Sequence, residues 1–415
     1  MSKFTRRTFL KSAAATSFLT SSLSLPYAAY GDKDAILVGG LHDLSGALDF
    51  AGIPMNQVMS LAVDEINVKG GVLGKEVKQV VYDPQSNMSL YSQYATQMSL
   101  KDKVAVVQGG ITSASRETIR PIFHRFKTLY FYNTLYEGGV CDRNEISLGT
   151  TPAQTVEKLV PHVMKLFGKK VYTIAADYNY GQITAAWVKR FVEENGGEVV
   201  ETEFFPLDVT QFGATISKIQ ASSPDMVMSV LVGTGHLGFY RQWAASGMKT
   251  KIPMASTTFG AAGSEPIIMT PQEANGIITC YGYYPTIDSP TNKAWLEKVK
   301  TKYPTNTPIL SELSECTWEG MMIWADAVNE AGSLERDKVL EVLESGKSYN
   351  MPSGKVSIDP LTHHAIRDVY IADLQDRTFL IKEKFSQVQP LDTQQVCNLK
   401  KTPNANVHYE ISLDD

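Results

Sequence analysis

Three polar, aromatic-rich segments of the 415-residue chain carry side chains that can hold a small molecule by hydrogen bonds. They contain Ser113, Ser115, Tyr132, Thr134, Tyr178 and Tyr180. The two serines stand where a predicted strand ends and a predicted helix begins, and the N–H groups and hydroxyls of such a turn can bind a carbonyl or a carboxylate. Helix capping by the serines and core packing by the tyrosines are the alternative roles. The pattern predicts a binding site and leaves its ligand open.

A fourth segment, Gly233–Gly238, matches the G-x-G-x-x-G pattern of dinucleotide-binding turns and contains Thr234. Such sites also use an acidic residue about 20 residues further on to bind the ribose. No Asp or Glu occurs from Phe239 to Ser264. We therefore interpret Gly233–Gly238 as a glycine-rich turn lining a cleft, and an exported NAD-dependent dehydrogenase is kept as the opposing hypothesis.

Other signatures of catalysis and metal binding are missing from the sequence. It has no P-loop, His-Glu-x-x-His or Gly-x-Ser-x-Gly pattern. The neighbours His363 and His364 are expected to point apart, which does not suit a metal site. None of the four cysteines forms a Cys-x-x-Cys pair, although one or two disulfides are compatible with an oxidising compartment. We expect no enzymatic activity, no cofactor and no metal.

The composition excludes further classes of protein. Hydrophobic residues make up 43% of the chain, which is too apolar a mixture for a disordered protein. With 39 basic and 44 acidic side chains the net charge is −5, and this disfavours nucleic acid as a partner. Beyond the N-terminus no apolar run reaches the roughly 18 residues of a membrane span.

The N-terminus is typical of an export signal. Residues 5–11 read TRRTFLK, and a weakly apolar stretch and small residues follow. The pair Arg6 and Arg7 fits the twin-arginine pattern, and we expect cleavage of residues 1–31 near Gly31. Residues 1–31 contain no cysteine that could take a lipid anchor. The mature protein is therefore expected to be free in the periplasm.

The rest of the chain alternates short apolar runs with amphipathic segments. Strands are predicted at 36–41, 77–82, 104–108 and 128–132, separated by helices at 55–66, 90–100 and 115–126. The rhythm restarts after Pro152, with strands at 170–175, 198–204, 226–232 and 252–255, and helices at 155–167, 184–195, 212–221 and 237–246. Two doubly wound parallel sheets in tandem predict an α/β protein of two hinged lobes. Ligands of such sheets bind beyond the carboxyl ends of the strands, so the site is expected in the cleft.

Several short stretches occur in a characteristic order from about Ala35 to Phe385. They are DEIN at 64–67, GGVLGK at 70–75, TSASR at 112–116, YEG at 136–138, DY at 177–178, PL at 206–207, GTG at 233–235, IDSP at 287–290, and IDP at 358–360 followed by His363 and His364. As a set they resemble the type I periplasmic binding proteins, which have the leucine/isoleucine/valine-binding fold. They are most similar to the urea- and short-chain-amide-binding branch, which includes the amide sensor of amidase operons.

The resemblance implies a receptor that closes two Rossmann-like lobes on a small solute and then docks on an ABC permease driven by a paired ATPase. It also implies a hinge that the chain crosses three times. Lobe 1 is then expected at 34–150 and 283–350, lobe 2 at 151–282 and 351–385, and a C-terminal tail that packs back on lobe 1 at 386–415. We expect a monomer or a weak dimer.

The resemblance also assigns roles to individual residues. Ser113 matches the serine that contacts the ligand, Tyr132 and Thr134 match the pair after the fourth strand, and Tyr178 matches the aromatic lid of the second lobe. Ile111 stands where the amide sensor has a tyrosine, and this leaves the size of the pocket open.

The amino-acid binders of this family hold the ligand ammonium with a glutamate from the second lobe. The resemblance puts Thr257 and Thr258 at that place, with no acid nearby. A buried ammonium without a carboxylate is costly, so the expected ligand is a neutral solute, urea or a short-chain amide. A branched-chain amino acid remains an alternative, and so does a quaternary amine held through cation–π contacts by a tyrosine cluster. That cluster would consist of Tyr132, Tyr136, Tyr178 and Tyr180.

The division into lobes and tail suggests how the cysteines pair. Cys141 falls in the first lobe, and Cys397 falls in a polar tail that has no core to anchor it. We expect these two to form a disulfide, and we expect Cys280 and Cys316 to be buried and free.

Overall fold

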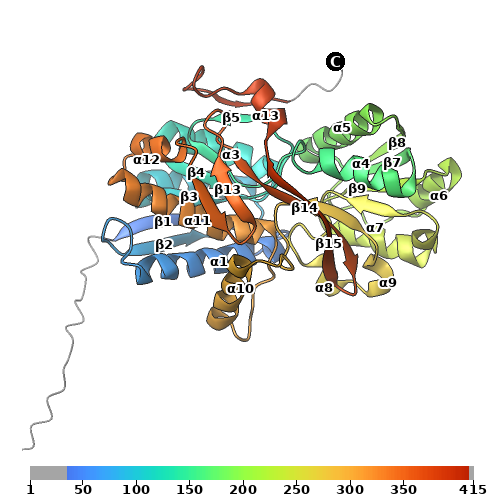
Figure 1. Cartoon of the computed structure of the whole chain (residues 1–415), viewed down its shortest axis with the longest axis horizontal. Helices are drawn as coiled ribbons and strands as arrows, with labels where there is room; N and C mark the ends of the chain where they lie inside the picture. The colour runs from blue at the N-terminus through green and yellow to red at the C-terminus, as the bar shows by residue number, and fades with distance from the viewer. Residues whose placement is uncertain (1–34, 411–415) are drawn as a thin grey trace, which may run out of the picture. The chain divides into compact units, whose positions relative to one another are not determined.

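The computed structural model describes residues 35–410, and Figure 1 shows how their helices and strands are arranged. Two large sheets, each flanked by helices, account for most of this part of the chain. The predicted export signal and its cleavage position lie outside the described residues. Within residues 35–410 no helix combines the length and the apolar character needed to cross a bilayer.

The first sheet follows the predicted alternation of strand and helix. Its strands are parallel and lie in the order β2-β1-β3-β4-β6. Every residue of β3 and β4 is buried, as expected for strands covered on both faces. The elements of this half are β1 (Ile36–Leu41), α1 (Asp49–Val68), β2 (Val77–Tyr82), α2 (Met88–Gln97) with a π-helical turn (Met98–Asp102), β3 (Val106–Gly109), α3 (Ser113–Phe126), β4 (Leu129–Tyr132), β5 (Val140–Asp142) and β6 (Glu145–Ser147).

The second sheet has the strand order β12-β13-β14-β11-β10-β9-β7-β8, and β15 pairs with β14. Its first elements are α4 (Val156–Phe167), β7 (Lys170–Ala176), α5 (Asn179–Glu194), β8 (Glu198–Phe205), α6 (Gly213–Ser222), β9 (Met226–Val230), α7 (Thr234–Ala245) with a 3-10 turn (Met248–Thr250), and β10 (Met254–Ser256). The predicted restart of the rhythm is confirmed up to β10, but the sheet is mixed and not parallel as predicted, because β14 pairs antiparallel with β11, β13 and β15. Helix α7 begins earlier than predicted, at Thr234, and so does α5, at Asn179. Gly181 permits this early start, because a Cβ there would lie 1.9 Å from the carbonyl oxygen of Ala176.

The chain beyond β10 contains elements that the sequence pattern did not predict. They are α8 (Glu265–Ile268), α9 (Pro271–Ala274), β11 (Ile278–Tyr281), α10 (Pro290–Lys302), α11 (Glu312–Ala331), α12 (Arg336–Leu343), β12 (Ser348–Met351), β13 (Gly354–Ile358), β14 (Ala365–Gln375), β15 (Thr378–Val388), α13 (Leu391–Val396) and β16 (Asn406–His408). The long helix α11 packs on α1 and β3 of the first sheet.

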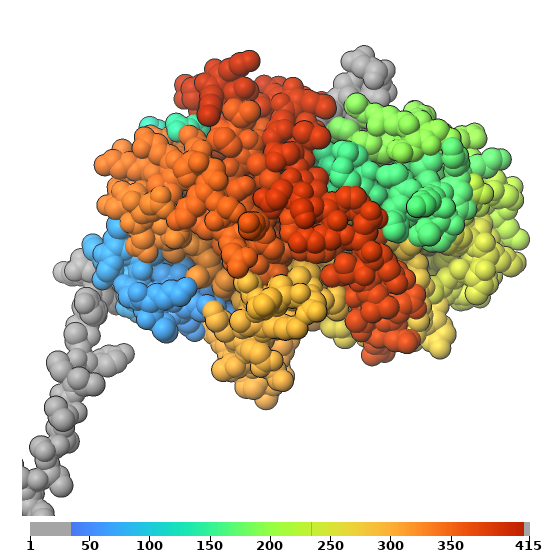
Figure 2. Space-filling view, viewed as in Figure 1, coloured from blue at the N-terminus to red at the C-terminus, as the bar shows by residue number. Residues whose placement is uncertain are grey.

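Strand β14 pairs with β13 along its first residues and with β11 further along. Near its start Arg367 lies opposite Val356 of β13, and further along Asp373 lies opposite Ile278 of β11. Figure 2 shows the red surface of β14 and β15 running between the orange helices α11 and α12 and the green and yellow part of the chain. Because β15 continues to Val388, the tail begins later than the predicted residue 386.

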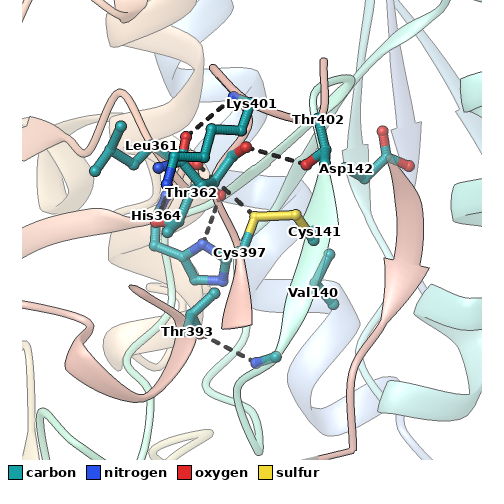
Figure 3. Close-up of a disulfide and its surroundings, with 12 residues drawn as sticks. Val140, Cys141, Asp142, Leu361, Thr362, His364, Thr393, Cys397, Lys401 and Thr402 are labelled. Carbon is teal, nitrogen blue, oxygen red and sulfur yellow. Dashed lines mark hydrogen bonds between the residues drawn. A yellow bond between two sulfur atoms is a disulfide. The ribbon is translucent and has the colours of Figure 1, made fainter. Parts of the chain in front are cut away.

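The tail is fixed to strand β5, which follows β4 in the chain. Cys397 forms a disulfide with Cys141, which is the pairing expected from the sequence (Figure 3). Strand β16 pairs antiparallel with β5, and Val407 lies opposite Cys141. Cys280 and Cys316 are free and buried, as predicted.

The turn between β3 and α3 depends on two glycines with positive φ. Gly109 has φ +155° and Gly110 has φ +74°. A Cβ at Gly109 would lie 2.2 Å from the carbonyl oxygen of Leu41, and one at Gly110 would lie 3.0 Å from the hydroxyl of Tyr130. Only glycine fits this close approach without strain. The two glycines therefore allow the short turn from the end of β3 to the start of α3 at Ser113.

Carboxylates of α11 hold the segments that pass between the two sheets. Glu312 accepts hydrogen bonds from the backbone N–H of Thr150 at 2.8 Å and of Gly282 at 2.7 Å. Arg367 of β14 donates to Glu315 at 3.0 Å and to the carbonyl of Leu148 at 2.8 Å. Three separate connections therefore meet at one buried face of α11.

Candidate functional site

A cavity of about 100 Å³ lies at the carboxyl ends of strands from both sheets. This is where ligands of α/β sheets bind. The segments after β3 and β4 line it from one side, and the segments after β7, β9 and β10 line it from the other. Phe50 and Ala51 of α1 and Leu313 of α11 complete the lining. The apolar residues of the whole lining are Leu48, Phe50, Ala51, Ile111, Leu135, Leu231, Val232, Ala261, Ala262 and Leu313.

Most of the predicted ligand-binding residues line this cavity. They are Ser113, Tyr132, Thr134, Tyr178, Tyr180 and Thr258. Ser115 is not among the lining residues, and its hydroxyl is used inside the turn. It donates to the carbonyl of Thr112 at 2.8 Å and accepts from the N–H of Ile111 at 3.1 Å. Thr234 begins α7, and its side chain lies outside the described residues.

Three hydroxyls of the lining already donate their hydrogens to protein oxygens. Tyr132 donates to the carbonyl of Ile111 at 2.9 Å, and Thr258 donates to the carbonyl of Leu231 at 2.7 Å. Ser113 donates to the carboxylate of Glu137. A carbonyl and a carboxylate can only accept, so the direction of each bond is fixed. These hydroxyls therefore offer the cavity oxygen lone pairs rather than hydrogens.

The sequence analysis missed an acidic residue of the site. Glu265, which is the first residue after the acid-free stretch 239–264, lines the cavity together with His236. The expectation that no acid lies near Thr258 is therefore wrong. Glu265 opens the four-residue helix α8, whose length gives no periodic signal in the sequence.

His236 and Glu265 face each other in the lining of the cavity. The ring Nδ1 lies 2.9 Å from the carbonyl of Leu231, which can only accept, so Nδ1 carries a hydrogen. Nε2 lies 3.2 Å from Glu265 Oε1 but makes no hydrogen bond within the described residues.

A second buried ion pair lies directly behind Ser113. Arg116 and Glu137 are both fully buried, and Arg116 Nη2 donates to Glu137 Oε1 at 3.0 Å. The guanidinium also lies 4.4 Å from the ring centroid of Tyr136 and 5.1 Å from that of Tyr132. Two of the four tyrosine rings proposed for a quaternary amine, those of Tyr132 and Tyr136, therefore already contact the arginine of the chain itself. The sequence showed both charged residues but gave no sign that they pair.

The remaining motifs have structural roles. His363 contacts Glu344 at 3.0 Å, whereas His364 Nδ1 lies 2.8 Å from the carbonyl of Thr362, so the two rings point apart as predicted. Among residues 35–410 no group of three or more His, Cys, Asp or Glu side chains could hold a metal ion. Gly233, with φ +84°, precedes α7 and lines the cavity, as predicted for a glycine-rich turn.

Comparison with known proteins identifies the family. A model of the "Periplasmic binding protein domain" matches residues 36–393. The chain belongs to the periplasmic binding protein family. A similar curated protein is the "Leu/Ile/Val-binding protein homolog 6" of Brucella melitensis, which is 24% identical over 383 residues that span 90% of this chain and 96% of the relative. The leucine-, isoleucine-, valine-, threonine- and alanine-binding protein of Pseudomonas aeruginosa is 24% identical over 72% of this chain and 79% of its own.

Solved structures agree with this assignment. A solute-binding protein of an ABC transporter from Rhodopseudomonas palustris, in complex with 4-hydroxybenzoate, has 25% identity and a TM-score of 0.77, covering 86% of this chain and 98% of that chain. A leucine-binding protein from Thermotoga maritima has 20% identity and a TM-score of 0.75, which shows a shared fold. The predicted two-lobed α/β fold is thus confirmed. The chain is a periplasmic substrate-binding protein of an ABC transporter and not an enzyme.

The ionisation of Glu145, beside this site, predicts how the stability of this periplasmic binding protein depends on pH. Burial raises the pKa of Glu145 from 4.5 to about 7, against the opposing charges of Arg116 and Arg120. Between these values the folded state holds a proton that the unfolded state has released, so stability falls as pH rises from about 4.5 to about 7. The loss amounts to about 3 kcal/mol. Glu145→Gln lacks this titrating group, so between pH 5 and pH 8 its free energy of unfolding should fall by about 3 kcal/mol less than that of the wild type. Urea unfolding of both proteins at the two pH values measures the difference. Equal losses in the two proteins would contradict the assignment.

Proposed function

We propose that this binding protein captures a neutral solute rich in hydrogen-bond donors, a short-chain amide or urea, for import. The observation that carries the proposal is the direction of the hydroxyls of Ser113, Tyr132 and Thr258. Each donates to a protein oxygen and so can only accept from a ligand. The N–H groups of an amide satisfy such acceptors, whereas the oxygens of a carboxylate do not.

The polar end of the ligand also needs a donor for its carbonyl. Thr112 and Ser113 line the cavity at the start of α3. The first N–H groups of a helix have no partner within the helix, and they carry the positive end of its dipole. A ligand carbonyl bound there would leave the NH₂ group of the amide to face the hydroxyl oxygens.

The charges around the cavity favour a neutral ligand. The Arg116 and Glu137 charges compensate each other, so this pair offers no unpaired charge to an ion. Burying an ion without a partner costs several kcal/mol. The apolar lining, which includes Leu48, Ile111 and Leu313, suits the alkyl part of an amide better than urea.

The same proposal covers the lobes and the route of export. Residues 34–150 with 283–350, and residues 151–282 with 351–385, would close on the solute, with Tyr132 and Tyr178 against its flat face. The closed form would dock on an ABC permease and its ATPase. Residues 1–31 would direct export through the twin-arginine route.

An apolar amino acid is the second candidate ligand. The supporting observation is that the carboxylate of Glu265 lines the cavity, where it could bind a ligand ammonium. The ligand carboxylate would then take the place of the amide carbonyl at the start of α3.

A calorimetric panel of acetamide, propionamide, urea, leucine, choline and 4-hydroxybenzoate tests the proposal. We expect acetamide and propionamide to bind and the last three to bind at least tenfold more weakly. Acetamide has four heavy atoms, each worth at most about 1.5 kcal/mol, and so its Kd is expected at some tens of micromolar. Leucine binding more tightly than either amide would refute the proposal.

The variant Glu265→Gln separates the two candidate ligands. Glutamine has nearly the same size as glutamate and keeps a hydrogen-bonding group beside His236, so the Kd of acetamide should change less than about threefold. If the ligand is an amino acid, the same variant removes the counter-ion of the ammonium, and the Kd of leucine should rise by about 100-fold. Isothermal titration of both ligands against both proteins gives the result.

A further inference from the structure

We propose that strand β16 of the C-terminal tail is a specificity-determining part of the ligand site, because His408 holds Arg116 and Glu137 in place and Glu137 sets the direction of the Ser113 hydroxyl. His408 and Glu137 are thus positioning residues that act through Ser113. The inference rests on the proposed function for the identity of the ligand.

His408 is held by contacts on both ring nitrogens. Nε2 lies 3.0 Å from the carbonyl of Gly138 and must donate to it, because a carbonyl only accepts. Nδ1 is then an acceptor, and it lies 3.5 Å from Nη2 of Arg116. The ring is therefore neutral, which agrees with a pKa lowered by burial and by the charge of Arg116.

Glu137 connects this contact to the cavity. One of its oxygens accepts from Arg116 at 3.0 Å, and the other accepts from the hydroxyl of Ser113. Both oxygens of the carboxylate are therefore engaged, and the Ser113 hydrogen cannot turn toward the cavity without breaking a charge-assisted bond. Ser113 thus presents only an acceptor to the ligand.

The tail supplies His408 from a distant part of the sequence. His408 lies opposite Val140 in the β16–β5 pair, and the N–H of Tyr409 donates to the carbonyl of Gly139 at 2.8 Å. The neighbouring Cys141–Cys397 disulfide fixes the same two segments together (Figure 3). Strand β16 has no residue in the cavity lining, and His408 acts on the ligand through Arg116, Glu137 and Ser113.

The decisive variant is Glu137→Gln. The glutamine oxygen would accept from Arg116, and its NH₂ group would donate to the Ser113 oxygen, which frees the serine hydrogen to donate into the cavity. Ser113 would change from acceptor to donor. We expect the ratio of Kd for acetate to Kd for acetamide, measured by calorimetry, to fall at least tenfold relative to the wild type. An unchanged ratio in a folded variant would overturn the inference.

Glu117→Gln is the matched control. Glu117 also accepts from Arg116, through Nε at 3.0 Å, and it makes no bond to Ser113. The variant removes the same charge beside the same guanidinium, so the acetate-to-acetamide ratio should stay within threefold of the wild type. A shift as large as that of Glu137→Gln would mean that charge, and not hydroxyl direction, sets the preference, and it would overturn the inference.

A measurement without ligand separates this inference from the proposed function. In His408→Ala we expect amide hydrogen exchange at residues 113–117 to be at least tenfold faster than in the wild type. If the wild type binds neither acetamide nor acetate, the proposed function fails, and the exchange result alone decides the role of His408. Unchanged exchange there would show that the tail does not position the site.

Discussion

Replacing Arg367 by leucine is expected to lower the free energy of unfolding by about 3–5 kcal/mol. The guanidinium is fully buried between α11 and β14, and it donates to Glu315 and to the carbonyl of Leu148. Leucine would leave the carboxylate of Glu315 charged and without its counter-ion in an apolar environment. The variant would also release a contact at the connections between the sheets. Urea unfolding at pH 7, followed by circular dichroism, measures the change.

Two further variants give this prediction its controls. Burial, with the charge of Glu315 adding to it, raises the pKa of Glu319 well above its usual range and so favours the protonated form of this carboxyl. Glu319→Gln should therefore cost less than about 1 kcal/mol, although Glu319 lies in the same cluster. The double variant Glu315→Leu with Arg367→Leu removes both charges and should recover part of the loss. A Glu319→Gln variant as unstable as Arg367→Leu would show that the charges are assigned wrongly.

The parallel strands were predictable because their signal is local. Between Ile36 and Ser256 most of the parallel strands are short apolar runs next to amphipathic helices, and both patterns can be read without knowledge of the fold, whereas the three-residue strands β5 and β6 were too short and too polar to be predicted. The β14–β15 hairpin was missed for an equally local reason. Its turn residues Asp376 and Arg377 have φ +45° and +67°. Two-residue turns with positive φ at both positions usually have the sequence Asn-Gly or Asp-Gly, and Asp-Arg does not match that signal.

The candidate site likewise contains some residues that the sequence predicts and others that it does not. Ser113, Tyr132 and Tyr178 stand at strand ends, so the topology of an α/β sheet is enough to bring them to one cavity. Glu265 and His408 come from a four-residue helix and a three-residue strand. The positions of these two residues in the fold depend on tertiary contacts, and such contacts cannot be predicted from the periodicity of the sequence.

Replacing Cys397 by serine is expected to lower the free energy of unfolding by about 3–5 kcal/mol. The disulfide joins residues that are 256 positions apart, so its loss frees a very long loop in the unfolded chain. The tail would then depend on weaker contacts. Asp392 accepts from the hydroxyl of Thr151 at 2.9 Å, and the hydroxyl of Thr393 accepts from the N–H of Gly139 at 3.0 Å. Urea unfolding under oxidising conditions measures the change.

Reduction of the wild type provides the control for this prediction. Cys280 and Cys316 are free, so a thiol reductant acts on the single disulfide of the described chain. Reduced wild type and Cys397→Ser should unfold at the same urea concentration, and the reductant should not change the variant further. Because β16 carries His408, the same variant should also weaken acetamide binding while the two sheets stay folded. Oxidised wild type and variant with equal stability and equal affinity would show that the tail is held by its other contacts and that the disulfide contributes nothing.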